Sequence, residues 1–188
     1  AEGEPTGKRV TTKDYSDATR YYMNKSSLPK VVGGFNSNIS FKNFDMSILM
    51  NFSFGSYLYD SVYASLMNGF ESPGRNGHPN LKNRWQNPGD KTDVPLFLNE
   101  QNDFNATSSR FLFKNNYLRV RGLNLGYTFD ENWMEKYQIQ GLRVYLQGDN
   151  LFTFQSHKGI DPEQALSGLT NNRSHQMKTI SLGVNLQL

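Results

Sequence analysis

Five segments of the chain alternate apolar and polar residues with a period of two, the pattern of β-strands that have one apolar face. The clearest covers residues 44–55, where about ten residues at about 3.4 Å each, tilted near 45°, rise roughly 24 Å. This height is close to the apolar band of about 25 Å on a transmembrane β-barrel. The pattern therefore predicts strands that cross a membrane. The apolar positions of this segment are Phe44, Met46, Ile48, Met50, Phe52 and Phe54.

The other four predicted strands cover residues 34–41, 117–129, 142–152 and 180–188. Only Lys42 and Asn43 separate the first strand from the second. This spacing predicts a two-residue hairpin turn and an antiparallel pair. We therefore expect an all-β, antiparallel fold.

The connections between the predicted strands alternate between long and short. Residues 56–116 and 155–178 form long polar connections, whereas the turns at Lys42 and at 130–141 are brief. Outer-membrane barrels show this asymmetry, with long extracellular loops and short periplasmic turns. The expected order is an extracellular loop at 1–30, a hairpin at 31–55, an extracellular loop at 56–116, a hairpin at 117–154, an extracellular loop at 155–178 and a closing strand at 179–188.

Five strands cannot close a membrane barrel. The smallest single-chain barrels have about eight strands, and an open sheet edge in hydrocarbon leaves backbone groups unpaired at a cost of several kcal/mol each. We therefore expect residues 1–188 to form the C-terminal part of a larger barrel, whose remaining strands lie N-terminal to them. The first and last predicted strands would pair with strands of that remainder.

Composition agrees with a barrel and argues against other classes. Hydrophobic residues make up 36% of the chain and the mean hydropathy is -0.67, yet aromatic residues reach 13%. Strands that alternate lipid-facing and lumen-facing residues give such a low average, and no apolar run reaches the roughly 20 residues of a spanning helix. The absence of cysteine excludes disulfides and thiolate sites. The net charge of +3 comes from dispersed Lys and Arg, so we expect no nucleic-acid partner.

A helix is predicted inside the 56–116 connection, where apolar residues recur at helical spacing and Gly69 and Pro73 mark the end. One interpretation is that this stripe packs the loop on itself, and the other is that it lines the pore mouth or contacts a partner. The stripe consists of Tyr59, Val62, Tyr63, Leu66, Met67 and Phe70.

No arrangement of residues in the sequence predicts catalysis, a metal site or a cofactor. His78, His157 and His175 lack the spacing of a zinc-binding pair, and no nucleophile elbow or phosphate loop is present. Asp161 and Glu163 could be a glycosidase pair, but the proline between them favours a turn. We therefore expect a protein that is not an enzyme.

The segment 84–90 is the best candidate for ligand or partner contact. Trp85 offers an apolar face for a sugar ring, and Arg84, Asn87 and Asp90 offer hydrogen-bond donors and acceptors. The alternative is that 87–90 is a tight turn that only holds the loop together.

Polar positions of the strands are expected to face the lumen. These are Asn51, Arg143, Tyr145 and Gln147, which alternate with apolar neighbours. The same alternation, carried back from Leu123 along the chain, places Arg119 and Arg121 outward, where they could pair with lipopolysaccharide phosphates. A bulge at Gly122 would turn them inward instead.

Several motifs together resemble the C-terminal region of SusC/RagA-like TonB-dependent transporters, in the order expected of that family. The last residues also resemble an outer-membrane assembly signal, through Gly183, Leu186 and Leu188, although such signals usually end in an aromatic residue. The motifs are Leu28-Pro29 with Gly33-Gly34-Phe35, the strand at Phe44, Arg84-Trp85 with Asn87-Pro88-Gly89-Asp90 and Val94-Pro95, Tyr117-Leu118-Arg119 with Leu123-Asn124-Leu125-Gly126-Tyr127, Asn150-Leu151-Phe152-Thr153, Gly159-Ile160-Asp161-Pro162-Glu163 and the terminal strand.

The resemblance implies a barrel of about 22 strands in the bacterial outer membrane. It further implies an N-terminal plug, energy supplied by the TonB complex, a SusD-like surface lipoprotein as partner, surrounding lipid and lipopolysaccharide, and an oligosaccharide or peptide as substrate. The plug and the TonB-contacting part would lie outside these residues. Two alternatives stay open, a passive porin and a soluble β-sandwich that binds carbohydrate.

Overall fold

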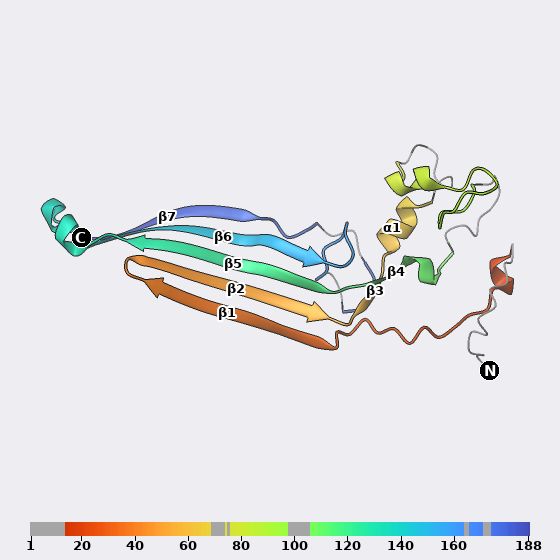
Figure 1. Cartoon of the computed structure of the whole chain (residues 1–188), viewed down its shortest axis with the longest axis horizontal. Helices are drawn as coiled ribbons and strands as arrows, with labels where there is room; N and C mark the ends of the chain where they lie inside the picture. Colours follow the sequence, from red (N-terminus) through yellow and green to blue (C-terminus); the bar gives the residue numbers. More distant parts are fainter. Residues whose placement is uncertain (1–13, 69–73, 75, 98–105, 164–165, 171–173) are drawn as a thin grey trace.

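The computed structural model describes residues 14–68, 74, 76–97, 106–163, 166–170 and 174–188. Its main feature is one five-stranded antiparallel sheet in the order β1-β2-β5-β6-β7 (Figure 1). All five predicted strands are confirmed, although β1 begins earlier than expected. The strands are β1 (Val31–Phe41), β2 (Phe44–Phe54), β5 (Tyr117–Thr128), β6 (Gly141–Gln155) and β7 (Thr179–Gln187).

One row of paired residues crosses the whole sheet on each face. Residues that pair directly point to the same side, so a row identifies a face. The row on one side is Ile39, Met46, Leu125, Leu146 and Leu182. The adjacent row, on the other side, is Asn38, Ser47, Asn124, Gln147 and Ser181. We call these sides the apolar face and the polar face.

No described element covers the apolar face. Leu125 is 43% exposed and Leu182 is 74% exposed, although both lie in the middle of their strands. The second sheet in the described part of the chain has two short strands, β3 (Tyr57–Tyr59) and β4 (Leu112–Lys114). A β-sandwich would bury its apolar face against another sheet. The soluble-sandwich interpretation is therefore not supported, and the sheet has the form of a barrel wall.

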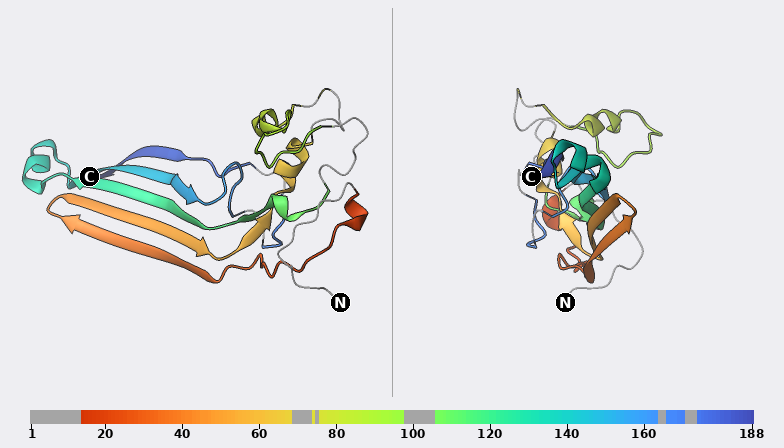
Figure 2. Two further views of the ribbon diagram at one scale, coloured as in Figure 1. Left: turned by 45° about the vertical axis from the view of Figure 1, so that its right-hand side comes forward. Right: turned by 90° about the vertical axis from the view of Figure 1, so that its left-hand side faces the viewer.

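The long and short connections lie at opposite ends of the sheet (Figures 1 and 2). The short-turn end holds the hairpin turn after β1, in which Lys42 has a φ of 53°, and the segment α2 (Glu131–Met134) with η5 (Glu135–Tyr137). The loop end holds η1 (Tyr15–Asp17), η2 (Pro79–Asn83) and η4 (Ser109–Phe111). The predicted alternation of connection lengths thus separates two ends of one sheet.

The predicted helix in the first long connection is present but short. Helix α1 spans Ser61–Leu66, whereas Tyr59 belongs to β3, and Gly69, Phe70 and Pro73 lie outside the described residues. Met67 and Phe111 are fully buried in a small loop core. This packing supports the interpretation that the apolar stripe folds the loop on itself. The buried members of this core are Ala64, Met67, Val94 and Phe111.

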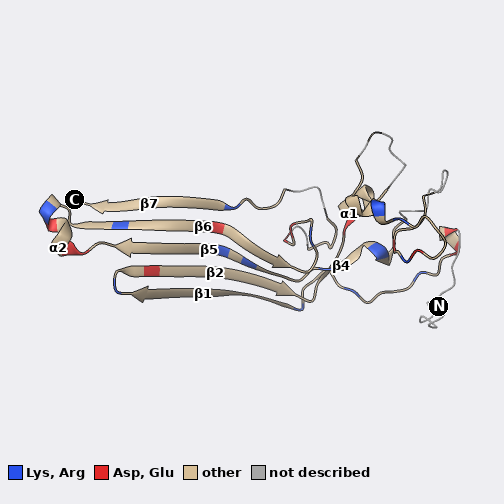
Figure 3. Ribbon diagram, turned by 45° about the horizontal axis from the view of Figure 1, so that its top comes forward, with Lys and Arg blue, Asp and Glu red and all other residues tan. Residues whose placement is uncertain are grey.

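Charged side chains are rare along the five strands and gather at the two ends (Figure 3). The charged residues within strands are Asp45, Arg119, Arg121, Arg143 and Asp149, apart from the lysine that ends β4. No helix in the described part of the chain is long and apolar enough to cross a membrane.

The two faces predict opposite responses to the same substitution. Ile48→Arg places a guanidinium on the apolar face near the middle of β2, and at the bilayer midplane this costs about 2–4 kcal/mol. We expect a marked loss of folded protein, measured as the heat-modifiable band on gels of membrane fractions. The matched control is Leu49→Arg, the next residue on the polar face, which should assemble normally. Equal assembly of both variants would show that the faces are assigned wrongly.

Candidate functional site

A β-bulge sets the direction of the arginines on β5. The pairing of β2 with β5 shifts its register between Leu49 and Met50, so that Arg121 has no partner on β2. Beyond this extra residue the alternation of β5 is reversed, and Arg119 pairs with Asn51 of the polar face. The expectation that both arginines point outward is therefore wrong. It assumed an uninterrupted alternation along β5, and the bulge interrupts that alternation.

Strand β6 has its own irregularity at the same level. Two residues, Asn150 and Leu151, lie opposite Arg121 alone, and Asn150 has a φ of 53°. Its side-chain oxygen accepts a hydrogen bond from Arg121 Nη1 at 3.4 Å, and its amide donates to the Met177 carbonyl at 3.3 Å. The bulge thus links β5, β6 and the segment that leads into β7.

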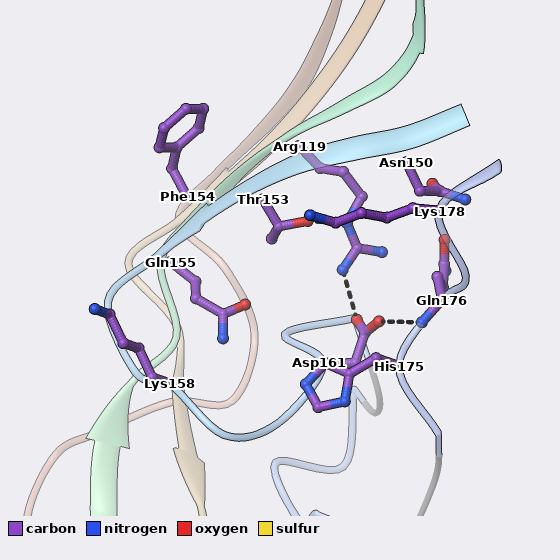
Figure 4. A pocket seen from close by; sticks show the side chains of 10 residues that line it. All are labelled: Arg119, Asn150, Thr153, Phe154, Gln155, Lys158, Asp161, His175, Gln176 and Lys178. Carbon is purple, nitrogen blue, oxygen red and sulfur yellow. Dashed lines mark hydrogen bonds and ion pairs between the residues drawn. The ribbon is translucent and has the colours of Figure 1, made fainter. Parts of the chain in front are cut away.

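Arg119 is buried on the polar face with all its guanidinium nitrogens bonded. Nε donates to Thr153 Oγ1 at 3.0 Å and Nη1 donates to Glu163 Oε2 at 2.7 Å. Nη2 donates to Asp161 Oδ1 at 2.9 Å (Figure 4). Its side chain is only 3% exposed. Because both carboxylates belong to the connection after β6, Arg119 fastens this loop to the barrel wall.

Glu163 joins β2, β5 and the segment before β7 to this anchor. It accepts from Arg121 Nη2 at 2.6 Å and from Gln176 Nε2 at 3.0 Å. Asn51 Nδ2 on β2 donates to Glu163 Oε1 at 2.9 Å, while Asn51 Oδ1 is buried without a partner in the described part of the chain. We call Arg119, Arg121, Asp161 and Glu163 the loop anchor. Its carboxylates bind arginines, so the glycosidase interpretation finds no support.

Asp161 is held as a carboxylate. It accepts hydrogen bonds from the backbone N–H groups of Glu163 at 3.0 Å and Gln176 at 3.1 Å. Burial by itself would raise the pKa of Asp161, but these two N–H groups and the Arg119 guanidinium lower it below its ordinary value. The bond from the Glu163 N–H closes the turn that the proline at this position predicted.

A polar cavity of about 560 Å³ lies beside the loop anchor (Figure 4). Thr153, Gln155, His175 and Gln176 contribute donors and acceptors to its wall, together with the anchored Asp161. These groups can hydrogen-bond a polar ligand, and Phe154 adds an apolar surface to the wall. Cationic lining comes from Arg119, Lys158 and Lys178.

The other predicted polar-face residues lie together near the short-turn end. Arg143 donates to both carboxylate oxygens of Asp45, at 3.0 and 2.6 Å, and its guanidinium lies 5.1 Å from the Tyr145 ring centre. Glycines make room for these groups, since a Cβ at Gly126 would overlap the ion pair and one at Gly183 would overlap the Tyr145 ring.

Gln147 and the strand terminus complete the predicted set. Gln147 lies on the polar face and donates to the Asp149 carboxylate at 3.2 Å. Leu186 pairs with Leu142 on the apolar face and is 53% exposed, and Leu188 is 78% exposed. The structure therefore places Gln147 and Leu186 on the sheet and Leu188 directly after β7, and the role of the terminus in assembly stays a prediction.

The segment 84–90 forms the tight turn that was one of its two interpretations. Asp90 Oδ2 accepts from the backbone N–H groups of Gln86 at 3.0 Å and Asn87 at 2.9 Å, and these bonds lower the pKa of Asp90. The Arg84 guanidinium lies 5.7 Å from the centre of the Phe97 ring, and the backbone N–H of Trp85 donates to the Val94 carbonyl. A contact of Arg84, Trp85, Asn87 and Asp90 with a ligand or partner stays a prediction.

The two long connections are joined by a buried aspartate that sequence reasoning missed. Asp60 Oδ2 lies 2.7 Å from His157 Nε2, and Thr170 Oγ1 donates to Asp60 Oδ1 at 3.2 Å. Burial would raise the pKa of Asp60, but hydrogen bonds from His157, from the Tyr63 N–H and from Thr170 lower it. The His157 ring stacks on Phe113 at 3.9 Å. Asp60 stands directly before α1, where an N-cap could have been expected, but His157 and Thr170 are 97 and 110 residues away and no local pattern could reveal them.

Known proteins similar to this chain are TonB-dependent receptors. The chain is 31% identical to TonB-dependent receptor SusC of Bacteroides thetaiotaomicron over 174 residues, which is 91% of this chain and 16% of that protein. It is 28% identical to TonB-dependent receptor P3 of Formosa agariphila over 170 residues, or 85% of this chain and 16% of that protein. The chain thus spans about a sixth of the length of the curated relatives it matches. No family model matches it.

Solved structures agree with the sequence relatives. The RagAB peptide importer in its closed-closed state superposes with a TM-score of 0.80 and 28% identity, over 97% of this chain and 20% of the other chain. The open-open state of the same importer gives a TM-score of 0.74 and 26% identity, over 95% and 19%. The resemblance to the SusC/RagA type and the fold as a fragment of a larger barrel are confirmed.

The loop anchor predicts unequal roles for its two arginines. Arg119→Met leaves Asp161 and Glu163 without their buried partner, and breaking such a pair costs about 3–5 kcal/mol. We expect faster hydrogen–deuterium exchange and proteolysis of the 156–178 connection in the complete receptor. Arg121→Met is the matched control, because Arg121 is 32% exposed and its loss leaves Glu163 bonded to Arg119. A much smaller effect is expected there, and equal effects would contradict the anchor.

The lowered pKa of Asp161 sets the pH range in which the anchor holds. Because the folded-state pKa lies below the ordinary value of 3.8, the carboxylate's contribution is present in full above that value and is lost as pH falls through the folded-state pKa. We expect exchange protection of 156–178, corrected for intrinsic rates, to be constant from neutral pH down to the ordinary value and to decrease below it. Asp161→Asn should remove this dependence. Protection lost well above that range would contradict the assignment.

Proposed function

The chain corresponds to a barrel segment of TonB-dependent receptors of the SusC/RagA type, and from this premise we propose that it forms wall and extracellular loops of a nutrient importer. The importer would take up an oligosaccharide or an oligopeptide across a bacterial outer membrane. Localisation in the outer membrane follows from the family. The chain itself would be non-catalytic, which is supported by relatives named as receptors and as an importer.

One observation carries the proposal, namely a single sheet with one mainly apolar face and one mainly polar face. Its apolar face is exposed across all five strands, whereas its polar face bears the ion pairs Arg143–Asp45 and Arg119–Asp161. A wall between lipid and an aqueous lumen needs this arrangement. In this proposal Asn51, Arg143, Tyr145 and Gln147 face the lumen.

The loop end is the proposed entry side. All the long connections meet there, and the cavity beside the loop anchor opens among polar groups suited to hydrated substrates. The match to a peptide importer supports an oligopeptide as the substrate class. We further propose that a SusD-like surface lipoprotein covers this end, and that a plug and a TonB-contacting segment in the rest of the receptor couple uptake to energy.

Active uptake is separated from passive diffusion by its energy dependence. In cells that produce the complete receptor, uptake of a fluorescent oligopeptide mixture should fall to background after tonB deletion or protonophore treatment. A parallel oligosaccharide mixture tests the other substrate class. Passage of either mixture at the same rate without TonB would identify a passive porin and overturn the proposal. Receptor abundance, measured by the heat-modifiable band, controls for assembly.

A further inference from the structure

Three lysines from two distant parts of the chain gather where the sheet meets the loop end. Lys25, Lys30 and Lys114 line one cavity of about 420 Å³. Amides and hydroxyl groups of Asn24, Ser26 and Asn116 also line it, and no carboxylate does. We call this cavity the lysine pocket. It is separate from the cavity beside the loop anchor, with which it shares no residue.

Backbone hydrogen bonds hold the walls of the lysine pocket in place. The Lys30 N–H donates to the Phe54 carbonyl at 2.9 Å, and the Tyr57 N–H donates to the Ser26 carbonyl at 2.8 Å. These bonds fix the segment before β1 against the chain that leads from β2 into β3. The pocket therefore lies on a rigid frame rather than between free loops.

Gly55 brings Lys30 close to this frame. Its φ is +88°, and a Cβ there would lie only 2.8 Å from Lys30 Cγ, so the stem of the lysine packs where another side chain would stand. The Gly55 N–H donates to Asn116 Oδ1 at 2.7 Å, which adds the start of β5 to the frame. The position of one lysine is thus built into the backbone.

The positive charge of the pocket is not compensated. Within the described residues, none of the three lysines forms an ion pair. Lys25 Nζ lies 4.7 Å from the Tyr57 ring, a contact that holds a cation without neutralising it. Like charges in one cavity repel, and an anion that bonds to several ammonium groups would relieve this repulsion.

The pocket lies at the upper limit of the apolar face. Val31 is 55% exposed and Phe54 is 41% exposed on this face, and in the chain they directly follow Lys30 and directly precede Gly55, respectively. With the loop end outside the cell, as in the proposed function, the pocket has the height of the outer-leaflet headgroups. We propose that the lysine pocket binds a phosphate group, carried either by a lipid headgroup or by a free phosphate.

The test uses the complete receptor purified in an uncharged, phosphate-free detergent. Binding is measured by microscale thermophoresis for inorganic phosphate alone and for lipid A in mixed micelles, with dephosphorylated lipid A as the reference. We expect phosphorylated lipid A to bind more tightly than the reference. Lys25→Gln/Lys30→Gln/Lys114→Gln should weaken phosphate-dependent binding about tenfold, if each contact contributes about 0.5 kcal/mol.

Matched variants separate the pocket from net charge. Lys42→Gln/Lys82→Gln/Lys136→Gln removes the same charge elsewhere and should bind as the wild type does. Replacing the pocket lysines by arginine should preserve binding, and Lys114→Gln alone serves if the triple variant does not fold.

The two ligands identify the source of the phosphate group. Binding of lipid A without binding of inorganic phosphate assigns the headgroup as source, and comparable binding of both assigns free phosphate. Wild-type receptor that binds neither, or a triple Gln variant that binds as tightly as wild type, overturns the proposal, whatever the result of the uptake experiment.

Discussion

The structure depends on one constraint, that each strand keeps its apolar side chains on the same side of the sheet from one end to the other. In β5 the apolar positions Leu118 and Val120 are out of phase with Leu123 and Leu125, so an uninterrupted alternation would break this rule. Between equivalent apolar positions β5 has one residue more than β2, at Arg121, and β6 has two more, so that its alternation returns to the same phase. The bulges therefore preserve the faces while they add twist at the loop end.

The same bulges place charge on the polar face. Burial of Arg119 is costly unless its bonds are made, and here each guanidinium nitrogen has a partner. A buried ion pair of this kind contributes little net stability compared with apolar packing. Its effect is to position the loop, because two nitrogens of the Arg119 guanidinium bond Asp161 and Glu163 at the same time and so fix the orientation of their turn. Arg143 and Asp45 show the opposite case, a half-exposed pair that satisfies charge without fixing a loop.

Local patterns predicted the strands, and they failed where distant segments meet. The hairpin of β1 and β2 follows from period two and a two-residue gap, which need no tertiary information. The directions of Arg119 and Arg121 could not be predicted in this way. The alternation placed two arginines on an apolar face, and this unfavourable placement was the available sign of a bulge. Asp161 and Glu163 were correctly assigned to a turn, but their arginine partners lie more than 40 residues away. Helix α1 was predicted too long because Tyr59, part of its apolar stripe, is a strand residue that pairs with β4.

The two long connections are bonded to each other, and one of them is also bonded to the sheet. At the upper level, Asp60 caps α1 and contacts both His157 and Thr170, and the Tyr59 N–H donates to the Gly168 carbonyl at 2.7 Å. At the lower level, the loop anchor binds the 156–178 connection to β5, and β3, which follows β2 in the chain, pairs with β4, which precedes β5. Displacement of one connection must therefore move the other or break buried polar contacts. If a lipoprotein covers this end, force on the loops would reach the barrel wall through Arg119 rather than be absorbed by loose chain.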